Sequence, residues 1–292
     1  MKNVKKIAFT TDSNSGILPD EYKTQGVFVL PMPFLVNGEP YFENINLSQA
    51  EFYALLESEA KVSTSQPSLG ELHEFWSNIL KEYDEIVHIP MSSGLSESCA
   101  AATRLAKEFN GRVSVVDNRR ISVTLKQSVL DALILRDRNK TALEIKKYLE
   151  DTAGDSSIYI AVDTMKYLKK GGRVTPAAAA IGTILKIKPV LAIRGAKLDK
   201  FALSRNTLKA KETMKTAIKN DLENQFAKFV EKGEMAIFIA HTNDEAGAKA
   251  FAQEVQKLFP HIPVTACEPL SLSVSCHIGP GALAVACARV FK

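Results

Sequence analysis

Short apolar runs alternate with longer amphipathic segments along the first half of the chain. The apolar runs at residues 7–10, 86–90 and 113–116 have the length of buried strands. Helix-length segments follow at residues 96–109, 122–135 and 141–151. Strands that alternate with helices in this way predict a mainly parallel, doubly wound α/β sheet.

Turn and cap signals mark the ends of these elements. Asn37-Gly38 lies between an extended segment at 27–36 and residues 41–42, which predicts a two-residue hairpin turn. Three capping boxes, each with a glutamate three residues after the cap, predict helix starts at Ser48, Ser68 and Thr141. The polar segment 62–68 is expected to be a loop without a structural role.

The pattern changes after residue 155. Strands are expected at 158–162, 235–240 and 264–267, a basic turn at 168–173 and a hairpin at 190–203. Helices are expected at 176–187, 207–229 and 245–258. This order predicts a second α/β domain with a mixed sheet, so that the domains span residues 1–155 and 156–292.

Composition excludes several classes of protein. Apolar residues make up 46% of the 292 residues and charged residues 24%, as in a folded globular protein without a membrane span. The formal charge of +4 comes from scattered lysines, typical of a solvated face and not of a nucleic-acid site. The start of the chain runs into a strand without a secretory signal, so we expect a cytoplasmic protein. The four cysteines lack metal-ligand spacing and are expected to be reduced thiols; no metal is predicted.

A turn of small polar residues follows the strand at 86–90. Ser92, Ser93 and Gly94 precede a helix expected to start at about Ser96, and such a start can offer backbone N–H groups to an anion. Ligands often lie at the carboxyl ends of parallel strands. Taken alone, such a turn is more often an ordinary helix cap.

Other loops carry further polar candidates. Asp12 follows the first strand and is expected to accept backbone N–H bonds in an Asx-turn. His277, expected in a loop, precedes Gly279-Pro280-Gly281, where glycines indicate a close approach of the backbone to another group.

Phosphate-binding loops, dinucleotide fingerprints, zinc-protease motifs and the G-x-S-x-G elbow are all missing from the sequence. The neutral hydroxyls of Thr64 and Ser93, with His277 and Arg173, suit a singly charged planar anion such as a carboxylate. A phosphate would more often recruit several Arg or Lys residues. Residues 177–187 and the neighbouring strands could wall an apolar cleft for a tail, or could be interdomain core.

Two alternatives stay open at this point. One is a serine hydrolase or acyltransferase with Ser93 as nucleophile, His277 as base and Asp117 or Asp12 as the aspartate of the triad. The other is a binder of phosphorylated metabolites that uses Arg173 and the Ser93 turn.

Five segments together resemble the DegV family, in that family's order and over essentially the whole chain. They are residues 11–13, 64–68, 92–96, 168–173 and 277–281. The resemblance implies a two-domain α/β protein with a long-chain fatty acid in a tunnel between the domains. It also implies a non-catalytic, cofactor-free subunit that presents the fatty acid to a separate bacterial fatty acid kinase.

The same resemblance assigns roles to residues of this chain. Thr64 and Ser93 would hold the carboxylate through their hydroxyls, His277 would bond the same head group, and Arg173 would lie nearby. Neighbours in the same loops complete the implied ligand site, namely Ser63, Ser92 and Gly94. The chain departs from the family at Glu97, where a glycine is usual; an acidic residue in a first helical turn suits the helix dipole.

Overall fold

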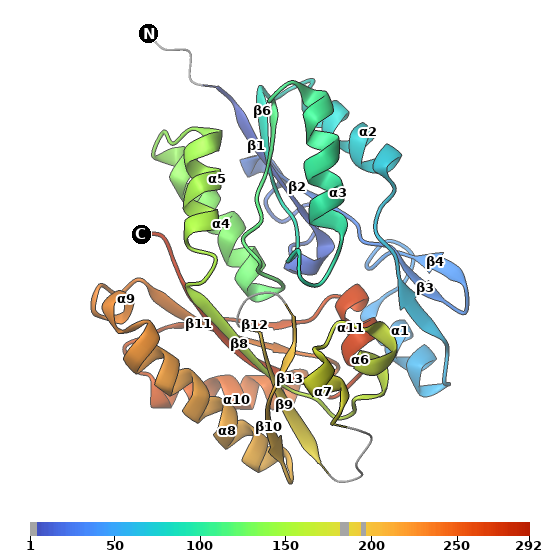
Figure 1. The fold of residues 1–292 in the computed structure, drawn as a ribbon, viewed down its shortest axis with the longest axis vertical. Coiled ribbons are helices and arrows are strands. Elements are labelled where there is room, and N and C mark those ends of the chain that lie inside the picture. Colours follow the sequence, from blue (N-terminus) through green and yellow to red (C-terminus); the bar gives the residue numbers. More distant parts are fainter. Residues whose placement is uncertain (1–4, 182–186, 194–196) are drawn as a thin grey trace.

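The first half of the chain forms a parallel sheet. The computed structural model describes residues 5–181, 187–193 and 197–292, and Figure 1 shows this sheet in the upper part of the molecule. Its strands pair in the order β2-β1-β6-β7, and all three pairings are parallel. They span Val27–Leu30 (β2), Ile7–Asp12 (β1), Glu85–Ile89 (β6) and Val113–Val115 (β7). The predicted parallel sheet is confirmed.

Helices cover both faces of this sheet. Ala8 and Ile86 pack with Trp76 on one face, and Phe9 and Val87 belong to a second core on the other face. The helices are α2 (Leu69–Ile79) and α3 (Ser98–Leu105) on the first face, and α4 (Val123–Asp137) and α5 (Ala142–Asp151) on the second. Alternate strand residues therefore point to opposite helix layers, as a doubly wound sheet requires.

A small antiparallel sheet, β4-β3-β5, lies beside the parallel sheet (Figure 1). It contains β3 (Phe34–Val36), β4 (Glu39–Tyr41) and β5 (Val62–Thr64), and α1 (Gln49–Glu57) packs against it. The predicted Asn37-Gly38 hairpin is confirmed, as are all three capping boxes. The expectation of a loop at 62–68 is wrong for its first three residues, because Val62 is buried beside Phe34 and β5 pairs with β3.

The second half forms a six-stranded mixed sheet in the order β10-β9-β8-β13-β11-β12, which confirms the predicted mixed sheet. Only the pairing of β11 with β12 is parallel. The strands are β8 (Ser156–Ala161), β9 (Lys188–Ile193), β10 (Asp199–Ser204), β11 (Met235–His241), β12 (Val264–Pro269) and β13 (Leu283–Arg289). The sequence pattern did not predict β13, which occupies the middle of this sheet.

Three helices cover the outer face of the mixed sheet. They are α8 (Thr207–Asn220), α9 (Ala227–Glu231) and α10 (Glu245–Leu258) (Figure 1). The expected single helix over 207–229 is interrupted by a π-helical turn at Asp221–Gln225. The Asp221 carboxylate accepts a hydrogen bond from the buried Tyr159 hydroxyl at 2.7 Å, and Leu222 and Phe226 both enter the core. Because these side chains are held in the core, the helix that begins with α8 does not continue regularly to residue 229.

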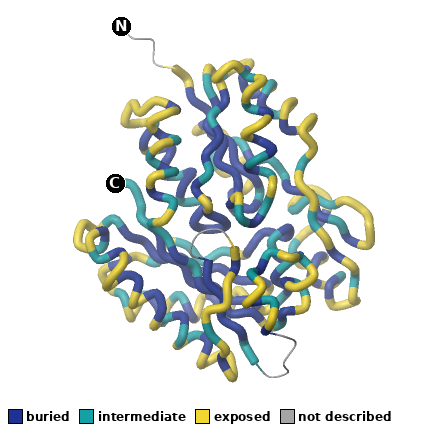
Figure 2. The backbone as a smooth tube through the Cα atoms, viewed as in Figure 1, coloured by how far each residue is buried: buried dark blue, intermediate teal, exposed yellow. Residues whose placement is uncertain are grey.

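The inner face of the mixed sheet packs against the first half of the chain. Ala284, Ala286 and Ala288 belong to the same core cluster as Phe9 and Leu125, and Figure 2 shows this buried region between the two sheets. The chain passes from one sheet to the other between α5 and β8, and the domain division at residue 155 stays a prediction. Within the described residues, no helix is long and apolar enough to cross a membrane.

Three short helices lie near the junction of the sheets: α6 (Lys166–Gly171), α7 (Pro176–Ala179) and α11 (Leu272–Ile278). The expected basic turn at 168–173 is instead the end of α6 and its left-handed Gly172. The expected helix at 176–187 has helical structure only over α7; residues 182–186 lie outside the described part of the chain. His277 is in the last turn of α11 and not in a loop.

Short 3-10 turns complete the described secondary structure. They span Ser13–Ser15, Lys23–Gln25 and Ala106–Phe109. The first of them follows β1 directly and carries Asn14 into the space between the sheets, where it lines a cavity.

Candidate ligand-binding site

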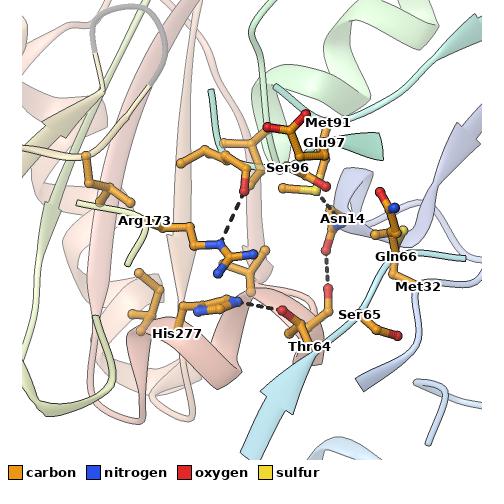
Figure 3. A pocket seen from close by; sticks show the side chains of 16 residues that line it. Asn14, Met32, Thr64, Ser65, Gln66, Met91, Ser96, Glu97, Arg173 and His277 are labelled. Carbon is orange, nitrogen blue, oxygen red and sulfur yellow. Dashed lines mark hydrogen bonds between the residues drawn. The ribbon is translucent and has the colours of Figure 1, made fainter. Parts of the chain in front are cut away.

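A cavity of about 280 Å³ lies where the two halves of the chain meet. Figure 3 shows side chains from the first half on one side of it and Arg173 and His277 from the second half on the other. Its polar lining consists of Asn14, Thr64, Ser65, Gln66, Ser96, Glu97, Arg173, Ser273 and His277. Its apolar lining consists of Met32, Met91, Leu95, Ile121, Leu198, Val274 and Ile278. The structure thus brings three of the predicted site residues together.

Thr64 and His277 form the centre of this polar group. The Thr64 Oγ1 and His277 Nε2 atoms are 2.8 Å apart and share a hydrogen bond (Figure 3). Thr64 is the last residue of β5, and α11 packs against that strand. A Cβ atom at Gly171 would overlap the His277 ring, so the end of α6 holds the imidazole from its other side.

His277 is neutral at physiological pH. Burial, followed by repulsion from the Arg173 guanidinium, lowers the pKa of His277 to about 4. A neutral imidazole carries one N–H and one lone pair, so its bond to Thr64 can run in either direction. When Nε2 donates, the Thr64 hydroxyl proton points onward and can be donated to a ligand in the cavity.

The low pKa of His277 predicts a resonance that does not titrate near neutrality. Between pH 8 and pH 5.5 the Cε1–H signal of His277 should keep the position of a neutral ring, because protonation begins only as the pH approaches about 4. NMR over this range measures it, and His277→Gln assigns the signal. A midpoint near the ordinary value of about 6.5 would contradict the site geometry. Arg173→Gln should raise the midpoint, since a repelling cation is removed.

Arg173 connects α6 with the turn after β6. Its Nε donates to the Leu95 carbonyl at 3.4 Å, and its Nη1 donates to the Gly171 carbonyl. The half-buried guanidinium lines the cavity and supplies a positive charge close to the Thr64–His277 pair. Glu97, which is exposed, supplies a negative charge to the same lining.

An apolar cavity of about 50 Å³ adjoins the polar one. The two share Leu95, Ile121, Leu198, Val274 and Ile278. The rest of the apolar lining comes chiefly from the inner face of the mixed sheet: Ile158, Ile160, Ile193, Phe238, Ala240, Ala284 and Ala286. The strands therefore supply the expected apolar wall. Ala178 and Ile181, which belong to the predicted wall segment 177–187, are core residues that do not line either cavity.

The turn at residues 91–98 differs from the expected anion cradle. The Gly94 N–H donates to the Ser92 hydroxyl, the Leu95 and Ser96 N–H groups to the Ser92 carbonyl, and the Ser98 N–H to the Ser96 hydroxyl. These N–H groups are therefore used within the turn. Helix α3 begins at Ser98 with Glu97 at its N-cap, so the expected start and cap at Ser96 are wrong, and Glu97 is not in the first helical turn.

Ser93 is not brought into the cavity. Its side chain is exposed and does not line the cavity, whereas Ser92 is buried. Ser63 is exposed on β5, next to Thr64. The hydrolase alternative is not supported, because the described hydrogen bond of His277 Nε2 goes to Thr64 and not to Ser93. The ligand roles of Ser93, Ser63, Ser92 and Gly94 stay predictions.

Asn14 is a lining residue that the sequence pattern did not predict. It is buried, its side-chain oxygen accepts hydrogen bonds from the Ser271 and Ser273 hydroxyls, and its amide nitrogen contacts the Met91 sulfur. It therefore connects the turn after β1 to the start of α11. The polar run Asp12-Ser13-Asn14 directly after a buried strand was the available signal.

Two local predictions near the cavity are confirmed. The Asp12 carboxylate accepts hydrogen bonds from the N–H groups of Asn14 at 3.0 Å and Met91 at 2.8 Å. Burial nevertheless raises its pKa to about 6. Gly279 and Gly281 both have positive φ, and a Cβ atom would collide with Tyr167 at the first and Asp163 at the second. The close approach expected of this segment therefore occurs against the protein itself.

Comparison with known proteins identifies the family of this chain. The family model for DegV, a family described as uncharacterised, matches residues 6–290. The chain belongs to the DegV family. A DegV domain-containing protein of Deinococcus radiodurans is 30% identical over 283 residues, which cover 96% of this chain and 97% of that protein.

Solved DegV structures share the whole fold. One is the structure of a DegV family protein from Thermus thermophilus that is described as binding fatty acid. It matches this chain with a TM-score of 0.87 and 27% sequence identity, and the match covers 98% of this chain and 100% of that one. DegV from Bacillus subtilis, described as a fatty acid binding protein, has a TM-score of 0.82 and 26% identity, covering 98% and 99%. The similarity thus extends over both sheets of the fold.

Proposed function

We propose that this DegV protein binds one long-chain fatty acid between its two sheets and presents the carboxylate to a separate ATP-dependent kinase, which forms the acyl phosphate. Thr64, His277 and Arg173 hold the carboxylate, and the tail enters the apolar cavity. The observation that carries the proposal is the junction of the two cavities: one polar and one apolar space share lining residues, as the head and tail of one molecule require. The described fatty acid binding of the Thermus and Bacillus relatives supports it.

The chemistry of the lining fits the two ends of such a ligand. A carboxylate that leaves water needs hydrogen bonds in exchange, and a hydroxyl, an imidazole and a guanidinium can supply them. Each buried methylene contributes about 0.8 kcal/mol. A tail of about 16 carbons would therefore provide on the order of 10 kcal/mol before the costs of association are subtracted.

Denaturing extraction followed by lipid mass spectrometry tests the proposal. The purified protein should release a long-chain fatty acid, or take one up in roughly equimolar amount after delipidation and incubation. Recovery of no fatty acid, with no uptake on incubation, would refute the binding function.

The presentation step has a separate test. Protein loaded with labelled palmitate should give acyl hydroxamate, the hydroxylamine-trapped acyl phosphate, when ATP and an extract of the source cells are added. Loaded protein with ATP alone should give none, because the kinase is a separate partner. Hydroxamate without the extract, or none with it, would contradict this part of the proposal. Since ATP is the phosphoryl donor, this protein and its kinase would work in the cytoplasm. Neither a nucleic acid nor stable membrane insertion is needed for this function.

A further inference from the structure

A second cavity with polar lining residues adjoins the Thr64–His277 pair. Its volume is about 230 Å³, and Thr64, Arg173 and His277 line both this cavity and the first one. Strand β5 and helix α6 together supply most of the remaining lining residues, and Tyr167 and Cys276 are among the less polar ones. A group attached to the carboxylate of a ligand held at Thr64 would therefore lie next to this second cavity.

The charge of the second cavity differs from that of the first. Lys61, Lys166 and Lys170 line it together with Arg173, and Glu59 is its only acidic lining residue among those described. Lys166 and Lys170 are four residues apart on α6 and therefore share one face of that helix. The three lysines are exposed, and within the described residues none of them forms an ion pair with a carboxylate.

A singly charged carboxylate does not need such a surplus of cations, but a phosphate does. Phosphate oxygens are bound most strongly by clusters of lysine and arginine that donate charge-assisted hydrogen bonds. The first cavity has one arginine opposed by Glu97, whereas the second has four cationic side chains opposed by Glu59. The two compartments are thus matched to different anions.

We infer that the second cavity is a phosphate subsite, which holds the phosphoryl group of an acyl phosphate while the acyl tail stays in the apolar cavity. The inference builds on the proposed fatty acid function and adds a ligand class to it. Lys61, Lys166 and Lys170 contact the phosphate oxygens, and Arg173 lies between the carboxyl end and the phosphate. The protein would then retain its ligand after phosphorylation as well as before it.

Isothermal titration of the delipidated full-length protein tests the subsite. The probes are palmitate and hexadecylphosphonate, a stable compound with a phosphate-like head on a long alkyl chain. Lys166→Ala together with Lys170→Ala should lower phosphonate affinity about 10-fold or more and leave palmitate affinity within about twofold. Lys169→Ala is the matched control, because this lysine is exposed on the same helix but does not line the cavity. It should change neither affinity.

Three results would overturn the inference. Equal losses for both probes in the double variant would show a general charge effect, and no loss for the phosphonate would show that the lysines do not contact it. The double variant could instead lose affinity for ATP or inorganic phosphate and keep its affinity for the phosphonate. That result would assign the cavity to a ligand without an acyl tail. Failure of wild-type protein to bind palmitate would instead refute the proposed function itself.

Discussion

Replacing Thr64 with valine should weaken fatty acid binding by about 10- to 100-fold while leaving the fold intact. Valine keeps the shape of threonine and its suitability for a strand, so β5 should persist. The substitution removes the hydroxyl that bonds to His277 at the cavity. A hydrogen bond to a charged group is worth about 1.5–3 kcal/mol, which corresponds to this loss of affinity. Titration of delipidated protein with palmitate measures it.

Thr265→Val is the control for this experiment. Thr265 is exposed on β12 and does not line the cavity, so the same chemical change there should leave affinity unchanged. Ser93→Ala, measured beside it, tests the second hydroxyl implied by family resemblance. A loss comparable to that of Thr64→Val would establish Ser93 as a ligand and require its turn to move on binding. Unchanged affinity in Thr64→Val would remove Thr64 from the head-group site.

Enlarging Ala286 to leucine should shorten the acyl chain that the protein accepts. Ala286 is buried on the inner face of β13 and lines the apolar cavity. In wild-type protein, affinity should rise about fourfold with each added methylene, from about 0.8 kcal/mol each. If leucine excludes about four methylenes, palmitate binding loses about 3 kcal/mol, or roughly 200-fold. In titrations with fatty acids from octanoate to stearate, the affinity of the Ala286→Leu variant should stop rising at a shorter chain length than in wild-type protein. The affinity for octanoate should change little.

Ala288→Leu separates tail exclusion from general overpacking. Ala288 lies two residues along the same strand, faces the same core and is equally buried, but it does not line the cavity. Both substitutions should destabilise the fold by about 1–3 kcal/mol in thermal unfolding. Only Ala286→Leu should change the dependence on chain length. The same change in both variants, or in neither, would place the tail elsewhere.

The parallel sheet and the helix starts could be predicted because local sequence determines them. Apolar runs such as 86–90 alternate with amphipathic segments, and Ser48, Ser68 and Thr141 each cap a helix with their own glutamate partner. These signals involve residues within a few positions of each other. They do not depend on the rest of the fold.

The central strand β13 could not be recognised in the same way. Its residues alternate between large and small, with Leu283 and Val285 under the outer helices and Ala284 and Ala286 on the inner face. Both faces are buried, so the strand lacks the apolar–polar alternation that identifies a half-exposed strand. The small inner residues also leave space for the apolar cavity between the sheets.

The site was only partly predictable for a related reason. Thr64 and His277 were identified as candidates, but their direct bond depends on α11 packing into the small sheet, where Leu272 and Cys276 join Phe34 and Phe52. This packing crosses the chain from residue 34 to residue 276, and no local pattern reports it. In the turn after β6, the N–H groups of Gly94, Leu95 and Ser96 bond to Ser92, which no local pattern shows, and the ligand role of Ser93 stays a prediction.

A crystal structure of the delipidated protein soaked or co-crystallised with palmitate would show directly where the fatty acid binds. We expect the carboxylate within hydrogen-bond distance of Thr64 Oγ1, with His277 and Arg173 beside it. The tail should run along Leu95 and Ile278 towards Ala286. A fatty acid bound outside this cavity, or with its tail at Thr64 and its carboxylate among the alanines of β13, would contradict it.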